Sequence, residues 1–208
     1  MIATQPISMT MARMTHVSNL PQGIEAVCFD AFGTLVEITE SKGVGRRLLG
    51  LVASHQRREF KVRLMCEERN IAEWCALFEI RVTSQEVRDL ERDVMIEANS
   101  VRMRSGIVDA WSELRKSGVQ IGICSNLAAG YGAGVLAALP DRPDVTVFSY
   151  LSGVAKPNPE IYALVADRFG LDAKRILFVG DTPHADIEGP KCAGMVAMHI
   201  DEFERLRF

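Results

Sequence analysis

The sequence lacks three features that would each indicate a particular class of protein. No apolar run approaches the ~18 residues that a membrane-spanning helix needs, so no membrane partner is expected. The net charge of −3 gives no reason to expect a nucleic-acid partner, because such proteins usually carry a concentrated basic surface. The five cysteines form no C-x-x-C pair, and Cys28 and Cys124 lie within apolar runs. Buried thiols in a reducing cytoplasm are therefore expected.

The composition is that of an ordinary globular protein. Of the 208 residues, 48% are hydrophobic and 25% are charged, which suits one domain or a core domain with a small insertion. Residues 1–22 are rich in methionine and polar side chains and contain no continuous apolar stretch of the kind found in signal peptides. We expect this segment to be a flexible extension, and Met9, Met11 or Met14 is an alternative start.

Strands and helices are predicted to alternate through most of the chain. The short apolar runs typical of buried parallel strands are 26–29, 119–124, 145–150, 176–179 and 195–200. The helices predicted between and before them are 107–117, 129–139, 159–169 and 186–193. This alternation indicates an α/β fold with a Rossmann-like, doubly wound parallel sheet of about five strands.

A long helical insertion interrupts this pattern. About ninety residues separate the first two strands without a strand pattern of their own. Amphipathic helices are predicted instead at 41–54, 57–68, 71–81 and 84–101, the last with a capping box formed by Thr83 and Glu86. We therefore expect a helical module at 37–104, inserted into a core made of 23–36 and 105–208.

Polar side chains follow the predicted strands where a parallel sheet binds its ligands, beyond the carboxyl ends. These residues are Asp30, Ser125, Asn126, Lys156, Asp181 and Asp186. Three carboxylates make an oxygen-rich site of the kind that holds Mg²⁺ together with substrate phosphate. The Ser125 hydroxyl and the Lys156 ammonium suit anionic oxygens. An alternative role for Ser125 is the N-cap of the helix that follows.

The order of these motifs resembles that of the haloacid dehalogenase-like (HAD) hydrolase superfamily. DxxGT at 30–34, Ser-Asn at 125–126, Lys-Pro at 156–157 and GDxxxxD at 180–186 occur in sequence, and the resemblance spans residues 24 to about 200. It implies that the helical module is a cap that closes over the site and selects substrates.

The resemblance also implies a role for each motif residue. Asp30 would be the covalent nucleophile, Ser125 or Asn126 a ligand of substrate oxygens, and Lys156 a stabiliser of charge. The Mg²⁺ ligands would be Asp30, Asp181, Asp186 and the backbone carbonyl of Phe32.

Phe32 departs from the pattern of the family's phosphatases, which read DxDGT. The second acid of that motif protonates the leaving oxygen, and phenylalanine cannot do so. FDAFGTL resembles the 2-haloacid dehalogenases, in which halide leaves without a proton. Those enzymes use a cap arginine, for which Arg46, Arg47, Arg57 and Arg58 are candidates, and no metal. His184 and His55 are conceivable replacement proton sources, or ordinary exposed histidines.

The fourth motif favours phosphate chemistry, because clustered carboxylates repel one another without a cation. We therefore expect a cytoplasmic, Mg²⁺-dependent phosphatase that acts on a small anionic phosphorylated metabolite through an aspartyl-phosphate at Asp30. Two alternatives stay open. One is a metal-independent 2-haloacid dehalogenase with an ester intermediate on Asp30, and the other is a degenerate member that binds its ligand without turnover. The sequence indicates neither the substrate nor the oligomeric state.

Overall fold

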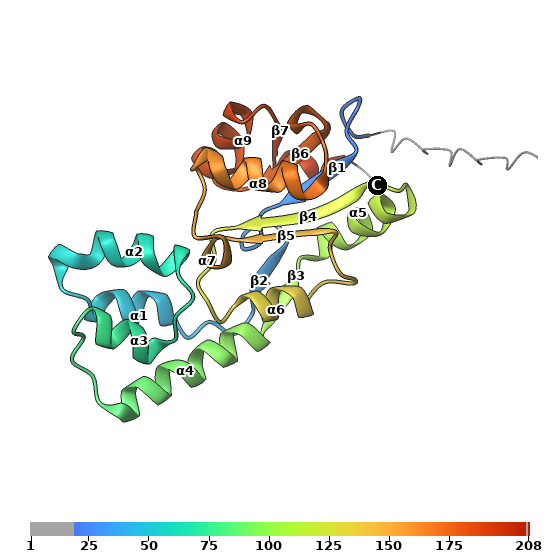
Figure 1. The fold of residues 1–208 in the computed structure, drawn as a ribbon. Coiled ribbons are helices and arrows are strands. Elements are labelled where there is room, and N and C mark those ends of the chain that lie inside the picture. The colour runs from blue at the N-terminus through green and yellow to red at the C-terminus, as the bar shows by residue number, and fades with distance from the viewer. Residues whose placement is uncertain (1–18, 207) are drawn as a thin grey trace, which may run out of the picture.

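A computed structural model describes residues 19–206 and 208 and contains a five-stranded parallel sheet in the order β5-β4-β1-β6-β7 (Figure 1). The strands are β1 (Ala26–Phe29), β4 (Gln120–Ser125), β5 (Val145–Phe148), β6 (Ile176–Gly180) and β7 (Val196–His199). In chain order, the central strand β1 is followed by β4 and β5 on one side of it, and then by β6 and β7 on the other side. The predicted doubly wound α/β fold is confirmed.

Side chains of the central strand alternate between two separate cores. Val27 and Phe29 of β1 point into one hydrophobic cluster, whereas Ala26 and Cys28 point into the other, because successive strand residues face opposite sides of a sheet. All four are fully buried. Both faces of the sheet are therefore covered, as expected for an all-parallel sheet.

Helices cover the two faces (Figure 1). One cluster takes its helical residues from α5 (Ser105–Lys116), α6 (Gly132–Ala137) and α10 (Ile200–Phe203). The other takes them from α8 (Pro159–Phe169), whose bounds match the prediction. α8 begins with Pro159 at its first position, and Gly170, which caps its C-terminal end after Phe169, adopts the left-handed conformation with φ 66°.

Three predicted elements near the site have different bounds. The run 145–150 ends as a strand at Phe148, because Ser149 begins the short helix α7 (Ser149–Ser152). The helix predicted at 129–139 begins only at Gly132. The segment 186–193 divides into a π-helical turn (Pro183–Glu188) and α9 (Gly189–Cys192). Short polar and glycine-rich segments carry little periodicity, which explains these errors.

The inserted segment forms four helices around a core of its own, here called the helical module. They are α1 (Val44–Leu51), α2 (Arg57–Cys66), α3 (Ile71–Leu77) and α4 (Ser84–Asn99), with a 3₁₀ turn at Ser54–Gln56. The Thr83–Glu86 capping box is present, and Asn70 with Glu73 forms another at the start of α3. Every module helix is shorter than predicted, because the sequence pattern does not show where a terminal turn unwinds.

Aromatic rings hold the module together. The Phe60 ring lies edge-on to Trp74, with centroids 5.6 Å apart, and edge-on to Phe78 at 5.0 Å. Such edge-to-face pairs add to the free energy gained by burying the rings. In Figure 1 the module forms a layer of helices beside the sheet, where α2 contacts α7.

A pair of strands absent from our prediction connects the module to the sheet. β2 (Val36–Ile38) and β3 (Val101–Met103) pair antiparallel, with Val36 opposite Met103 and Ile38 opposite Val101. Each strand has only three residues, which are too few to show an alternating pattern, so neither strand could be predicted from the sequence. The entry and exit of the module are thereby tied together.

The structure also bears on our expectations for the N-terminal segment, for membrane-spanning helices and for the cysteines. The predicted N-terminal extension lies mostly outside the described residues. Within residues 19–206 and 208, no helix is both long enough and apolar enough to cross a bilayer. All five cysteines are free, and Cys28 and Cys124 are buried as expected.

Phe60→Ala should destabilise the module. Phe60 is fully buried, and such a truncation removes burial and leaves a cavity, which typically costs about 3–5 kcal/mol of unfolding free energy. Urea denaturation would measure the loss. Val62→Ala on the same helix is the control, because Val62 is 61% exposed and should change stability by less than ~0.5 kcal/mol. Equal effects of the two substitutions would contradict the described core.

Candidate active site

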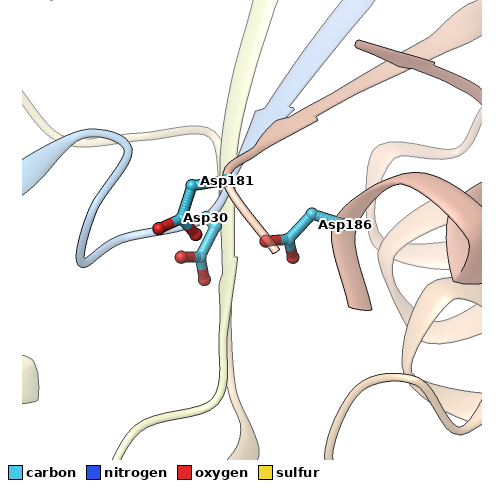
Figure 2. Close-up of side chains that lie close together, drawn as sticks. All are labelled: Asp30, Asp181 and Asp186. Carbon is cyan, nitrogen blue, oxygen red and sulfur yellow. The ribbon is translucent and has the colours of Figure 1, made fainter. Parts of the chain in front are cut away.

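Three carboxylates meet at the carboxyl edge of the sheet. Asp30 follows β1, and Asp181 and Asp186 follow β6, which pairs directly with β1. One oxygen from each lies within 4.8 Å of the others (Figure 2). β1 and β6 flank the point where the strand order reverses, and open α/β sheets bind ligands at that point.

Two glycines permit this close approach. Gly33 has φ 83°, a region that other residues rarely adopt, and a Cβ at this position would overlap the Asp181 carboxylate. A Cβ at Gly180 would overlap the side chain of Asp186. The glycines of the first and fourth motifs therefore make room for the acids.

Lys156 connects two of the three acids. Its ammonium donates to Asp30 at 2.7 Å and to Asp186 at 2.6 Å, and lies 5.1 Å from the centroid of the Phe178 ring. Burial lowers the pKa of Lys156, but the charges of Asp30 and Asp186 outweigh this effect and hold the pKa above its ordinary value. Lys156 is therefore a permanent cation inside the site.

Asn126 holds the backbone of Lys156 from both sides. Its amide group donates to the Lys156 carbonyl at 2.8 Å, and its side-chain oxygen accepts the Lys156 N–H at 2.7 Å. These two bonds join the segment after β4 to the segment that carries the lysine. The structure thus makes Asn126 a positioning residue for Lys156, and a substrate contact from Asn126 stays a prediction.

Asp186 is the most deeply buried of the acids, with 1% of its surface exposed. One carboxylate oxygen binds Lys156, and the other accepts the Thr182 N–H at 2.9 Å. Burial raises its pKa, although the Lys156 ammonium acts in the opposite direction. Asp181 is half-buried and accepts a hydrogen bond from the Thr182 hydroxyl at 3.2 Å.

Ser125 ends β4 beside these groups. It is buried, and within residues 19–206 and 208 its hydroxyl has no hydrogen-bond partner. The next helix, α6, begins at Gly132, so the alternative that Ser125 caps this helix is wrong. Its hydroxyl is thus available for a ligand.

Phe32 occupies the position of the second acid and packs against another aromatic residue. Its ring lies edge-on to Tyr131, with centroids 6.1 Å apart and an interplanar angle of 89°. Of the two candidate replacement histidines, His184 is exposed and lies 3.0 Å from Glu188, and His55 is exposed in the 3₁₀ turn. Both therefore fit the alternative of ordinary exposed histidines.

Glu97 links the module to the core, a role that our sequence analysis missed. Its carboxylate is 3% exposed and accepts the Tyr131 hydroxyl at 2.5 Å together with the N–H groups of Lys42 and Gly43 at 2.6 and 2.8 Å. Burial raises the pKa of Glu97, but these hydrogen bonds outweigh it and place the pKa below its ordinary value. The one carboxylate thus holds the start of α1 and the loop beside Phe32.

A sequence signal for Glu97 existed. It lies three residues after Val94 and seven after Leu90, on the apolar face of α4, where a charged side chain requires partners. The partners were not identifiable, because they come from segments far apart in the chain.

The donor set at the sheet edge suits Mg²⁺. It consists of carboxylate oxygens, which hard divalent cations prefer. The Lys156 ammonium contacts two of the three carboxylates, so a divalent cation would reduce the repulsion that remains among them. Asp30, Asp181 and Asp186 could hold such an ion, and the Phe32 carbonyl stays a predicted fourth ligand.

Comparisons with known proteins agree on the family. The model of haloacid dehalogenase-like hydrolases matches residues 24–194. Phosphatase MT3486 of Mycobacterium tuberculosis is 29% identical over 201 residues, which cover 88% of this chain and 90% of that protein.

Solved structures share the fold. A HAD family enzyme from Bacteroides thetaiotaomicron, in complex with magnesium and inorganic phosphate, is 16% identical and superposes with a TM-score of 0.63 over 85% of this chain and 93% of that one. A 2-haloacid dehalogenase from Pseudomonas syringae is 22% identical, with a TM-score of 0.55 over 84% and 85% of the two chains.

Glu97→Gln should make stability less dependent on pH. A carboxyl whose pKa is lowered by folding contributes stability above its unfolded pKa of about 4.3 and loses it as the pH falls through the folded pKa. We expect the variant to lose about 1–3 kcal/mol of unfolding free energy at pH 7 and the difference from wild type to narrow below pH ~4. Chemical denaturation across this pH range measures both.

The control for this substitution is Glu91→Gln on the same helix. Within the described part of the chain, Glu91 has no hydrogen bond or ion pair. A loss for Glu97→Gln that is constant from pH 3 to pH 7, or equal to that of Glu91→Gln, would contradict the prediction.

Proposed function

The chain belongs to the haloacid dehalogenase-like hydrolase family, and we propose that it is a Mg²⁺-dependent phosphatase that acts on a small phosphorylated compound through Asp30. The observation that carries the proposal is the meeting of three carboxylates and one ammonium at the strand-reversal point of the sheet. The relative from M. tuberculosis, which is named a phosphatase, supports the same activity.

Each residue of the site has a place in this chemistry. The Asp30 carboxylate attacks phosphorus, the ester bond to the leaving oxygen breaks, and water then hydrolyses the aspartyl-phosphate. Lys156, 2.7 Å from Asp30, orients that carboxylate and binds a phosphoryl oxygen, while the Ser125 hydroxyl binds another. Bound Mg²⁺ would neutralise charge on the phosphoryl group.

The leaving oxygen receives no proton from position 32. The Phe32 side chain has no ionisable group, and its ring packs against Tyr131. Burial and the Glu97 carboxylate raise the pKa of Tyr131, which makes its hydroxyl a poor acid. The enzyme should therefore favour phosphate esters whose alcohols leave readily without protonation.

Phe32 is also the observation that favours dehalogenation, the second candidate function. Against it stand the three clustered carboxylates and the contacts of the candidate arginines. Arg47 is paired with Asp93 at 2.6 Å, and Arg57 donates to backbone carbonyls of its own module. Arg46 and Arg58 are exposed on the module surface. Phosphate chemistry accounts for the three clustered carboxylates, whereas dehalogenation leaves them without a role.

The helical module would serve as the cap of this site. Its two connections to the core pair as β2 and β3, and Glu97 binds Tyr131 next to Phe32. A layer attached in this way can close over a bound substrate and exclude water.

Turnover of an aryl phosphate such as 4-nitrophenyl phosphate should require both Mg²⁺ and Asp30. We expect chelation to abolish it and Asp30→Asn to lower it by at least ~10³-fold, because the amide cannot form the covalent intermediate. Release of nitrophenol is the measurement. Chloroacetate with chelator is the parallel assay, and activity there without phosphatase activity would make the protein a dehalogenase. Mg²⁺-dependent phosphate binding without turnover would make it a degenerate member.

Phe32→Asp should restore the missing acid. General acid–base catalysis typically contributes 10²–10⁴-fold, so we expect kcat/KM for alkyl phosphates to rise by about 10²-fold or more. Aryl phosphates should gain much less, because their leaving groups need little protonation. Phe32→Asn is the matched control, since its amide has a similar size and transfers no proton at neutral pH. An equal gain for both substrate classes, or for the Asn variant, would argue against this explanation of Phe32.

A further inference from the structure

A cavity of about 510 Å³ lies between the helical module and the loop that follows Ser125 and Asn126. Residues of α1, α3 and α4, together with Leu64 of α2 and the loop 68–70, form its module wall, and residues 128–131 form its core wall. Asp30, Lys156 and the other acids do not line it. Tyr131 lines the cavity and its ring packs against Phe32, two residues beyond Asp30, so the cavity lies next to the first motif.

The module wall of the cavity is largely apolar. Val44, Leu48, Ile71 and Trp74 are buried residues that contribute to it. A cavity of this size with aliphatic and aromatic walls suits the organic part of a small molecule.

The charges around the cavity are mostly negative. Glu68, Glu73 and Glu91 line it, and Arg69 is the only cation among the lining residues. Arg69 binds Glu67 at 2.7 Å and lies over the Trp74 ring, so its charge is already partnered. Within the described residues, Glu68 and Glu91 have no hydrogen bond or ion pair. Such a lining repels anionic groups and attracts cations and hydrogen-bond donors.

We propose that this cavity holds the alcohol part of the phosphate ester, and that it selects an apolar alcohol that is neutral or cationic over one that carries a carboxylate. The inference rests on the proposed function, because the phosphate end would lie at Asp30. To that function the inference adds the chemical class of the leaving alcohol. A substrate carboxylate would meet two unpartnered carboxylates here.

The test uses three aryl phosphates that differ chiefly in the charge at the end of the 4-substituent. They carry a 4-(2-aminoethyl), a 4-propyl or a 4-(2-carboxyethyl) group, and their phenols have similar acidity, so the reactivity of the ester bond is nearly constant. We expect kcat/KM for the cationic and neutral esters to exceed that for the anionic ester by about 10-fold or more. Glu68→Lys with Glu91→Lys should remove or invert this preference, while Glu59→Lys, outside the cavity, should not.

Two glycines of α1 provide a matched pair for filling the cavity. Gly45 lines it and Gly50 does not, and a Cβ at either position meets no atom within 4 Å. Gly45→Leu should raise KM for the neutral ester about 10-fold, because the new side chain occupies the space of the propyl group. Gly50→Leu should leave KM unchanged. Both variants should fold, since leucine favours helix more than glycine does.

Binding of the free phenols separates this inference from the proposed function. Calorimetry with 4-propylphenol and tyramine requires no catalysis. Binding that Gly45→Leu weakens and Gly50→Leu does not would support the cavity assignment even if no ester is hydrolysed. Equal turnover of all three esters, a preference for the anionic one, or insensitivity to both Gly45→Leu and the lysine substitutions would overturn it.

Discussion

The Lys156 ammonium lies between Asp30 and Asp186 in a site where each of these groups is nearly inaccessible to water. Removing the lysine, or the two carboxylates, would leave a buried charge without a partner. This loss costs far more unfolding free energy than the loss of an exposed ion pair. The surrounding structure serves to hold this arrangement. Asn126 holds the lysine backbone, and the Thr182 N–H holds the far oxygen of Asp186.

This constraint also explains the architecture around the site. The acids and the lysine come from segments that follow three different structural elements, and the parallel sheet, with its carboxyl ends aligned, brings these segments to one edge. Gly33 and Gly180 leave the room that the carboxylates occupy. The protein thus holds three carboxylates and the Lys156 ammonium close together, an arrangement that suits the proposed divalent cation and anionic phosphate.

A second buried carboxylate organises the opposite side. Glu97 binds the backbone where the chain enters α1 and the hydroxyl of Tyr131, and Tyr131 in turn packs against Phe32. Position 32, where the resemblance to the family's phosphatases implies an acid, is therefore part of an aromatic contact between the core and the loop that lines the module cavity.

Local patterns in the sequence were sufficient for the α/β fold, the five sheet strands and the motif residues at their ends. Each depends on a short run of neighbours, such as the apolar residues before Asp30 or the proline and glycine that bound α8. They were not sufficient for the contacts of Asn126 with Lys156, for the β2–β3 pair, or for the hydrogen bonds of Glu97, which join residues at least 30 positions apart. Such contacts depend on how the elements pack. The sequence by itself determined which groups reach the edge of the sheet, and only the tertiary structure decided which of them bind one another and which are left for a ligand.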